Sequence, residues 1–241
     1  MPGLGTIVNA LAIIIGATIG FFAKGKISSR FQKTIMQVIG LSTMFIGVNG
    51  VVSQMLTFDG KAFSTQYTMN MILFLVIGSI IGEAIDIEEK LDSFGEWCKR
   101  KFNVKNDGEG FFVEGFISSS LLFCIGAMAI IGSLEDGINH NHTILFTKSL
   151  MDGISALIFA ASFGIGVYFS VVPLVIYQGL LTLLASVVSP FLTDSVIGQM
   201  SLVGSVLIFA LGINLIFGKK VKVGNMLPAI FLPLLYGLLP F

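Results

Sequence analysis

The sequence is poor in charge, cysteine and proline. Lys, Arg, Asp and Glu make up 12% of its 241 residues, whereas 54% are hydrophobic. An average soluble domain has about twice that charged fraction. This composition excludes a soluble globule, whose surface needs more polar cover, and a disordered chain, which needs low hydrophobicity. The two cysteines, Cys98 and Cys124, provide no disulfide framework. The sequence therefore indicates an integral membrane protein.

What the sequence does have is a series of apolar runs, and roughly 20 apolar residues cross a bilayer. We expect an all-α, polytopic membrane helix bundle of about eight transmembrane helices, forming one transmembrane domain over residues 1–241. Residues 223–241 are short and proline-containing, so a re-entrant or interfacial segment stays open there. The predicted spans cover residues 4–22, 34–56, 68–85, 111–133, 150–169, 171–190, 199–217 and 223–241.

Two boundaries follow from local signals. Residues 150–190 form one tract about twice as long as a crossing, and Ser170 with Pro173 marks its division, because a residue before proline avoids the helical conformation. Residues 86–106 alternate apolar and charged positions at helical spacing. They predict a cytoplasmic amphipathic helix, lying either on the membrane surface or under the bundle as a brace.

The basic residues are concentrated in alternate loops. Those after the first, third and seventh spans hold 12 of the 14 Lys and Arg residues, and Lys148 lies at the edge of the loop before the fifth span. Because short cytoplasmic loops are rich in Lys and Arg, both termini are predicted outside.

Small residues recur at every fourth position in some spans, for example Asp152, Ala156, Ala160 and Gly164. They predict close helix packing. Similar glycine and lysine patterns at the ends of several spans suggest an internal repeat of helical hairpins. A homo-oligomer stays open.

Polar residues inside spans are the candidate site, because they are costly in lipid. The candidates for solute or ion binding are Asn9, Asn49, Gly126, Asp152, Gln178 and Asn214. Hydrogen bonds between helices are the alternative for the polar ones. Gly126, inside the fourth span, indicates either a broken helix with free backbone groups or close packing. No Lys, Arg or His lies deep in a predicted span, which argues against a proton relay.

The sequence gives no sign of enzyme chemistry. It has no Ser/His/Asp cluster, no metal-ligand spacing and no glycine-rich phosphate loop after a strand. His140 and His142, beside Glu135 and Asp136, could hold a metal, but a chance pair is the simpler interpretation. We expect no catalytic residue, no cofactor, no metal and no nucleic-acid partner.

Several segments together resemble the YdfK/YqgA-type family of bacterial inner-membrane proteins. They are GTIVNALAIIIG at 5–16, SLLFCIGAMAIIGS at 120–133, KSLMDGISA at 148–156, QGLLT at 178–182, LGINL at 211–215 and NMLPA at 225–229. The resemblance implies a bacterial plasma membrane and no known catalytic residue or substrate; some members are labelled transporters. The family pattern commonly has proline after the glycine of the second segment, where this chain has Ala127.

Two functions therefore stay open. The first is a transporter or channel that moves a small solute or ion across the plasma membrane, with the lipid bilayer and that solute as partners. The second is a non-transporting scaffold or regulator, with residues 86–106 as the partner surface.

Overall fold

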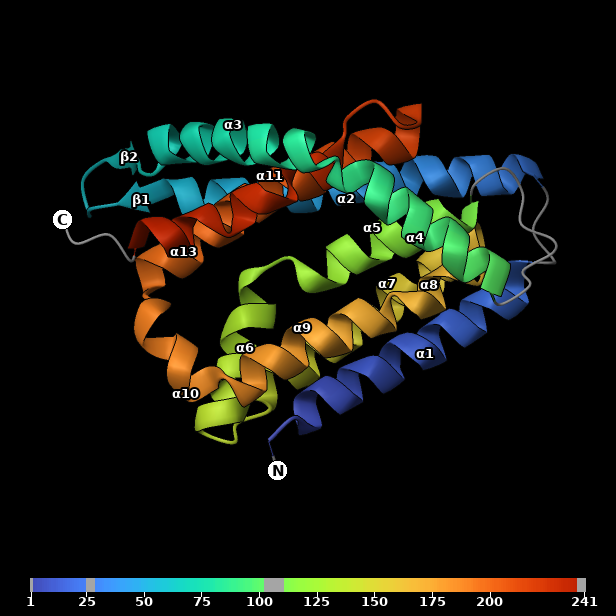
Figure 1. Cartoon of the computed structure of the whole chain (residues 1–241), viewed down its shortest axis with the longest axis horizontal. Helices are drawn as coiled ribbons and strands as arrows, with labels where there is room; N and C mark the ends of the chain where they lie inside the picture. The colour runs from blue at the N-terminus through green and yellow to red at the C-terminus, as the bar shows by residue number, and fades with distance from the viewer. Residues whose placement is uncertain (1, 25–28, 102–110, 238–241) are drawn as a thin grey trace. The chain divides into compact units, whose positions relative to one another are not determined.

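The computed structural model describes residues 2–24, 29–101 and 111–237. Nearly all of this chain is helical, as Figure 1 shows, because a backbone in lipid must satisfy its hydrogen bonds internally. The elements are α1 (Leu4–Lys24), α2 (Ser29–Met55), β1 (Leu56–Phe58), β2 (Phe63–Thr65), α3 (Thr68–Ile85), α4 (Ile87–Lys101), α5 (Phe111–Cys124), α6 (Ala127–Ile138), α7 (Thr143–Phe163), α8 (Gly166–Phe169), α9 (Val171–Leu183), α10 (Ala185–Val188), η1 (Ser189–Phe191), α11 (Asp194–Phe217), α12 (Val223–Met226), η2 (Leu227–Ile230) and α13 (Leu232–Gly237).

The predicted all-α membrane bundle is confirmed. Within the described ranges, six helical segments are long and apolar enough to cross a membrane: α1, α2, α3, α7, the stretch from α8 to α9, and α11. The bent pair α5 and α6 makes a seventh crossing if it is one span, and Val223–Gly237 is a shorter apolar segment. About eight spans is therefore a fair description of the chain.

The boundary between the fifth and sixth spans lies earlier than predicted. The chain turns at Gly164, whose φ of +82° favours glycine, and helix continues with only a slight irregularity through Ser170 and Pro173. In addition, α7 begins at Thr143 rather than at residue 150. Lys148 therefore lies inside a span, which corrects its placement in a loop.

The fourth predicted span is two helices with a break between them, as one of the two interpretations of Gly126 requires. Gly126 has a φ of +138°, and α5 and α6 on either side of it differ in direction by 58°. The residue after Gly126 is Ala127 and not a proline, so the conformational freedom of glycine is what permits the break.

A β-hairpin precedes α3, and a residue in the left-handed conformation follows it. A short antiparallel hairpin pairs Leu56 with Thr65, and its turn is held by Asp59, which accepts bonds from the Lys61 and Ala62 amides. These bonds lower the pKa of Asp59. After α3, Asp86 has a left-handed conformation, and α4, the predicted amphipathic helix, follows it. Residues 102–106 of that prediction lie outside the described residues. Residues 238–241 of the last predicted span do so as well.

The chain divides into two compact units. Unit 1 comprises Met1–Ile39, Leu91–Cys124 and Met128–Ser189, and unit 2 comprises Gly40–Lys90, Ile125–Ala127 and Pro190–Phe241. In unit 1, α1 packs along α7. In unit 2, α3 packs on α12 and η2, and Gly40 and Gly212 bring α2 and α11 into contact.

Candidate functional site

The contact between α1 and α7 positions the main cluster of polar side chains in unit 1. A Cβ atom on Gly16 would lie 2.0 Å from the carbonyl oxygen of Gly153, and one on Gly20 would lie 2.1 Å from that of Leu157. The two helices therefore approach closely only because these residues lack side chains. Close helix packing, which the sequence predicts from small residues, is seen here at Gly16 and Gly20, whereas Gly164 lies at the turn after α7.

This close approach brings Asn9 of α1 against α7. The Asn9 Nδ2 donates to Asp152 Oδ2 over 2.9 Å, and the Lys148 ammonium also donates to Oδ2. Lys148 and Asp152 are only 6% and 7% exposed, and Asn9 is fully buried. Lys148 and Asp152 stand four residues apart, so they share one face of α7. The result is a buried ion pair anchored by an amide from a second helix.

Elsewhere in unit 1, several other buried polar atoms lack hydrogen-bond partners within the described chain. In α9, Gln178 is fully buried, and neither its Nε2 nor its Oε1 has a partner. Other atoms in the same condition are Asn9 Oδ1, Thr6 Oγ1, Ser133 Oγ, Thr182 Oγ1 and Ser162 Oγ. Leaving such a group unpaired costs about 1–3 kcal/mol. All of these atoms lie in unit 1, so this unit holds buried polar groups that its own described chain does not satisfy.

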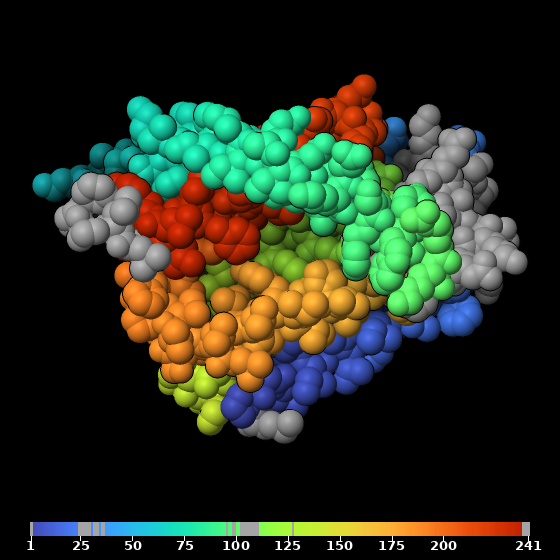
Figure 2. All heavy atoms as spheres, in the orientation of Figure 1, coloured from blue at the N-terminus to red at the C-terminus, as the bar shows by residue number. Residues whose placement is uncertain are grey.

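The helices that carry these side chains pack on one another. α9 packs on α1, and their atoms meet along one face of unit 1 in Figure 2. α6 reaches α9 as well, since a Cβ on Gly137 would lie 2.4 Å from the Thr182 carbonyl oxygen. We call the set Thr6, Asn9, Ser133, Lys148, Asp152, Gln178 and Thr182 the polar cluster.

Asp136 holds the start of α1. Its buried carboxylate accepts hydrogen bonds from the Gly3 and Gly5 amides at 3.0 and 2.9 Å, and it lies 3.0 Å from His142 Nδ1. A carboxylate at a helix N-terminus is favoured by the helix dipole. Asp136 and His142 therefore have a structural role. Among the described residues, no group of three or more His, Cys, Asp or Glu side chains could hold a metal ion.

The predicted candidates separate between the two units. Asn9, Asp152 and Gln178 all lie in unit 1, and the first two are in direct contact. Asn49 lies in unit 2 and is exposed. Asn214, also in unit 2, donates to the Val221 carbonyl and accepts from the Lys220 and Val221 amides, so it holds the loop after α11. Gly126 lies at the helix break.

Sequence reasoning missed Lys148, because the span was started two residues after it. The signal was present: KSLMD places Lys148 and Asp152 at the spacing of a helical ion pair. Thr6, Ser133 and Thr182 gave no comparable signal, since hydroxyl residues are common in spans and become notable only when their partners are known.

A second polar group joins α3 and α4 to α12 within unit 2. Glu83 accepts hydrogen bonds from Lys222 and Asn225 at 2.5 and 2.6 Å. Glu88 accepts one from the Gly224 amide at 2.6 Å, and its own amide donates to Asn225 Oδ1 at 2.7 Å. The bond to Glu83 raises the pKa of Lys222. These side chains satisfy one another, so the group is a structural connection rather than a vacant site.

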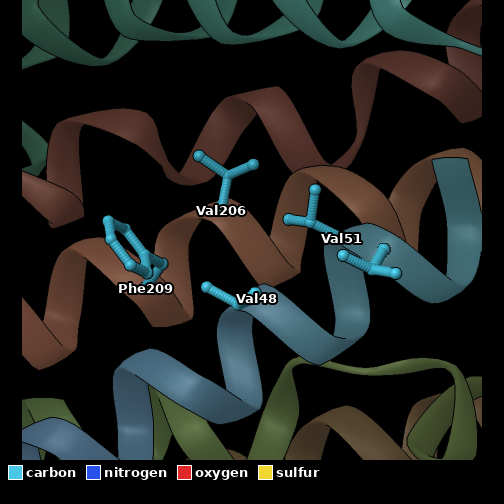
Figure 3. Close-up of a pocket in the computed structure, with 5 residues that line it drawn as sticks. Val48, Val51, Val206 and Phe209 are labelled. Carbon is cyan, nitrogen blue, oxygen red and sulfur yellow. The ribbon is translucent and has the colours of Figure 1, made fainter.

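Unit 2 also has a small groove between α2 and α11. Figure 3 shows it lined by Val48, Val51, Val206 and Phe209, with Val52 as a fifth residue. All the lining surface is apolar, so the groove offers neither a charge nor a hydrogen-bonding group to a polar solute.

Comparison with known proteins assigns the chain to a family of unknown function that includes a membrane protein. Residues 4–237 match the model of a family described as "Protein of unknown function (DUF554)". The uncharacterized membrane protein YdfK of Bacillus subtilis is 31% identical over 95% of this chain and 93% of its own length. The uncharacterized protein YqgA of Escherichia coli is 28% identical over 95% of this chain and 94% of its own length.

A dTDP-4-dehydrorhamnose 3,5-epimerase of Methanothermobacter thermautotrophicus matches a shorter region. It is 28% identical over 44% of this chain and 57% of its own length. No solved structure matches the chain.

Proposed function

We propose that this chain, which belongs to the DUF554 family, moves a small polar solute or ion across the bacterial plasma membrane through the polar cluster of unit 1. The observation that carries the proposal is Gln178. Its amide is fully buried among membrane-spanning helices, and neither its oxygen nor its nitrogen has a protein partner. Polar groups inside the membrane usually face a water-filled cavity or a solute pathway.

The ion pair supports the same interpretation. If hydrogen bonds between helices were the whole purpose of these residues, Gln178 and Asn9 Oδ1 should be paired, as Asn214 is in its loop. Buried pairs of charges add little net stability compared with apolar packing. Their presence in the same unit as unpaired amide and hydroxyl groups therefore favours a site that exchanges partners. No enzymatic step, cofactor or nucleic-acid partner enters the proposal.

The charge pattern sets the orientation within the proposal. With the lysine-rich loops in the cytoplasm, both termini lie outside. The polar cluster then stands in the outer half of the bilayer, because Asn9 and Lys148 belong to the first turns of helices that start outside. The bacterial sources of YdfK and YqgA support a bacterial plasma membrane.

The test is solute flux in liposomes that contain the purified full chain. Stopped-flow light scattering follows reswelling against a panel of small polar solutes and salts. We expect at least one solute to enter faster than in empty liposomes, and Gln178→Leu and Asn9→Leu to reduce that rate at least about tenfold, since each removes a polar group from the pathway. Asn49→Leu is the matched control, because Asn49 is exposed and lies in unit 2. Absence of flux for the whole panel, or equal rates in all three variants, would contradict the proposal.

The scaffold alternative has one favourable observation. Phe94 and Trp97 of α4 stack on each other at 5.8 Å and remain about half exposed, and Lys101 lies over the Trp97 ring. A scaffold would use this surface. Phe94→Ser with Trp97→Ser should leave solute flux unchanged if the chain is a transporter. Loss of a bound partner in pull-downs, with no flux in the unsubstituted chain, would favour the scaffold.

A further inference from the structure

The ion pair in the polar cluster restricts the charge of the solute that this site can accept. We propose that the solute is a small zwitterion of the amino-acid type, whose ammonium binds Asp152 and whose carboxylate binds Lys148. This inference rests on the proposed transport function and specifies its substrate class. Three observations support it: the burial of the two charges, the anchoring of one of them, and the unpaired polar groups in the same unit.

Because both charges are buried, the site is stable only when each charge has a partner of opposite sign. Lys148 and Asp152 are 6% and 7% exposed and neutralise each other. A buried charge that loses its partner is far less stable than a buried pair. A cation bound to Asp152 would leave Lys148 unpaired, and an anion bound to Lys148 would leave Asp152 unpaired. A zwitterion inserted between the two gives each buried charge a new partner, and the site stays neutral.

The two members of the ion pair also differ in how firmly they are held. Asp152 has a short side chain, and Asn9 fixes its Oδ2 from another helix at 2.9 Å. Lys148 carries its ammonium on a flexible four-carbon stem. The Lys148 ammonium can therefore move away from the pair, while the Asp152 carboxylate stays in place. The resident ammonium also shows that the Asp152 carboxylate accommodates a group of that shape and charge.

The unpaired groups supply the remaining contacts that a zwitterion needs. Asn9 Oδ1 belongs to the same side chain that holds Asp152, and Thr6 lies one turn away on α1; both can accept bonds from an ammonium. On α9, which packs on α1, Gln178 Nε2 is an unpaired donor of the kind a carboxylate oxygen accepts from. The site therefore offers acceptors and donors beyond the ion pair itself.

Other titratable groups near the pair do not disturb this balance. Cys124 of α5 lies within electrostatic range of Lys148, Asp152 and Tyr177. Thiols and phenols with ordinary pKa values are uncharged at neutral pH. Asp136 is engaged by two backbone amides and His142. The charge of the site at neutral pH therefore belongs to Lys148 and Asp152.

The test compares four molecules of nearly equal shape and different charge: L-alanine, L-alaninamide, L-lactate and L-lactamide. They represent the zwitterion, the cation, the anion and the uncharged form. Binding to the purified full chain at pH 7 is measured by the concentration dependence of its melting temperature. We expect L-alanine to bind at least about tenfold more tightly than the other three, because only it pairs both buried charges.

Charge-removing variants make the test specific. Lys148→Gln leaves only the carboxylate and should shift the preference to L-alaninamide. Asp152→Asn leaves only the ammonium and should shift it to L-lactate. Lys148→Gln with Asp152→Asn removes both charges, so it should fold even if a single variant does not, and it should lose the preference for L-alanine. Lys222→Gln, in the exposed pair with Glu83, is the matched control and should behave as the unsubstituted chain.

The outcomes separate this inference from the proposed function. Binding of none of the four molecules, a preference for an ion or for L-lactamide in the unsubstituted chain, or an unchanged preference in the charge variants would overturn the zwitterion proposal. Flux of another solute that depends on Gln178 would then still support transport. Absence of any flux would instead refute transport itself.

Discussion

At the scale of single residues, the polar cluster and the Asp136 contact illustrate two uses of a buried polar side chain. Both carboxylate oxygens of Asp136 are engaged, one by the Gly3 amide and the other by the Gly5 amide. Gln178 is equally buried and has no partner. The paired Asp136 carboxylate stabilises the folded structure. The unpaired Gln178 amide costs free energy unless water or a solute forms hydrogen bonds with it.

Replacing Asp136 by Asn should therefore destabilise the protein. The carboxylate is fully buried and accepts two backbone hydrogen bonds at the start of α1, where a negative charge is favoured. We expect Asp136→Asn to lower the free energy of unfolding by about 1–3 kcal/mol. Thermal melting of the detergent-purified chain measures the change.

The matched control for that measurement is Glu135→Gln. Glu135 is the neighbouring acid, and its side chain accepts a bond only from Asn139 among the described contacts. We expect its effect to stay within about 0.5 kcal/mol. Equal losses in the two variants would show that Asp136 has no special role at the helix start.

The sequence predicted part of this residue-scale chemistry. Asn9, Asp152 and Gln178 could be selected because polar residues in an apolar run are conspicuous. Asn49 and Asn214 satisfied the same rule, yet one is exposed and the other holds a loop. A single sequence does not show which way a helix faces or which carbonyl lies within reach, so it could not separate these cases.

At the scale of elements, close packing depends on a few glycines. Gly16 of α1 faces the Gly153 carbonyl oxygen of α7, with no room for a methyl group. This contact also places Asn9 beside Asp152. Packing and site geometry are therefore properties of the same helix pair.

Gly16→Ala should separate α1 from α7. An added Cβ would lie 2.0 Å from the Gly153 carbonyl oxygen, and such overpacking costs about 1–3 kcal/mol. Gly179→Ala in α9 is the control, because a Cβ added there would meet no atom of another element within 4 Å. There we expect no loss, or a gain of up to about 1 kcal/mol from the better helix propensity of alanine. Comparable melting temperatures for both variants would argue against a tight contact between α1 and α7.

Element boundaries were the least predictable part of the fold. Pro173 suggested a division at Ser170, but a proline in the first turns of a helix is tolerated, and the turn needs the positive φ available at Gly164. Gly126 breaks the fourth predicted span without a proline beside it. In both cases the decisive signal was a glycine, which is hard to recognise in a sequence with 28 of them.

At the scale of the whole molecule, composition predicted the class of protein securely. The apolar runs predicted the six helical segments that can span, the bent pair α5 and α6, and the shorter final segment. The internal repeat, self-association and membrane orientation stay predictions. Orientation is the one with the clearest physical basis, since it depends on the number of basic residues in each loop.

Cysteine labelling in intact cells tests that orientation. In a background with Cys98→Ser and Cys124→Ser, Lys61→Cys places a thiol in the hairpin, and Lys220→Cys places one in the loop after α11. We expect a membrane-impermeant maleimide to label position 61 in intact cells and position 220 only after permeabilisation, because loops rich in Lys and Arg stay in the cytoplasm. The reverse pattern would place both termini inside.

The central claim is that water and solute reach the polar cluster, and cysteine accessibility at Gln178 tests it most directly. Gln178 and Leu174 are both fully buried, one turn apart on α9. In the background lacking the native cysteines, the claim predicts that Gln178→Cys reacts with a small charged methanethiosulfonate in liposomes while Leu174→Cys does not. If position 178 is as unreactive as position 174, the polar cluster is closed to water and the transport account is wrong.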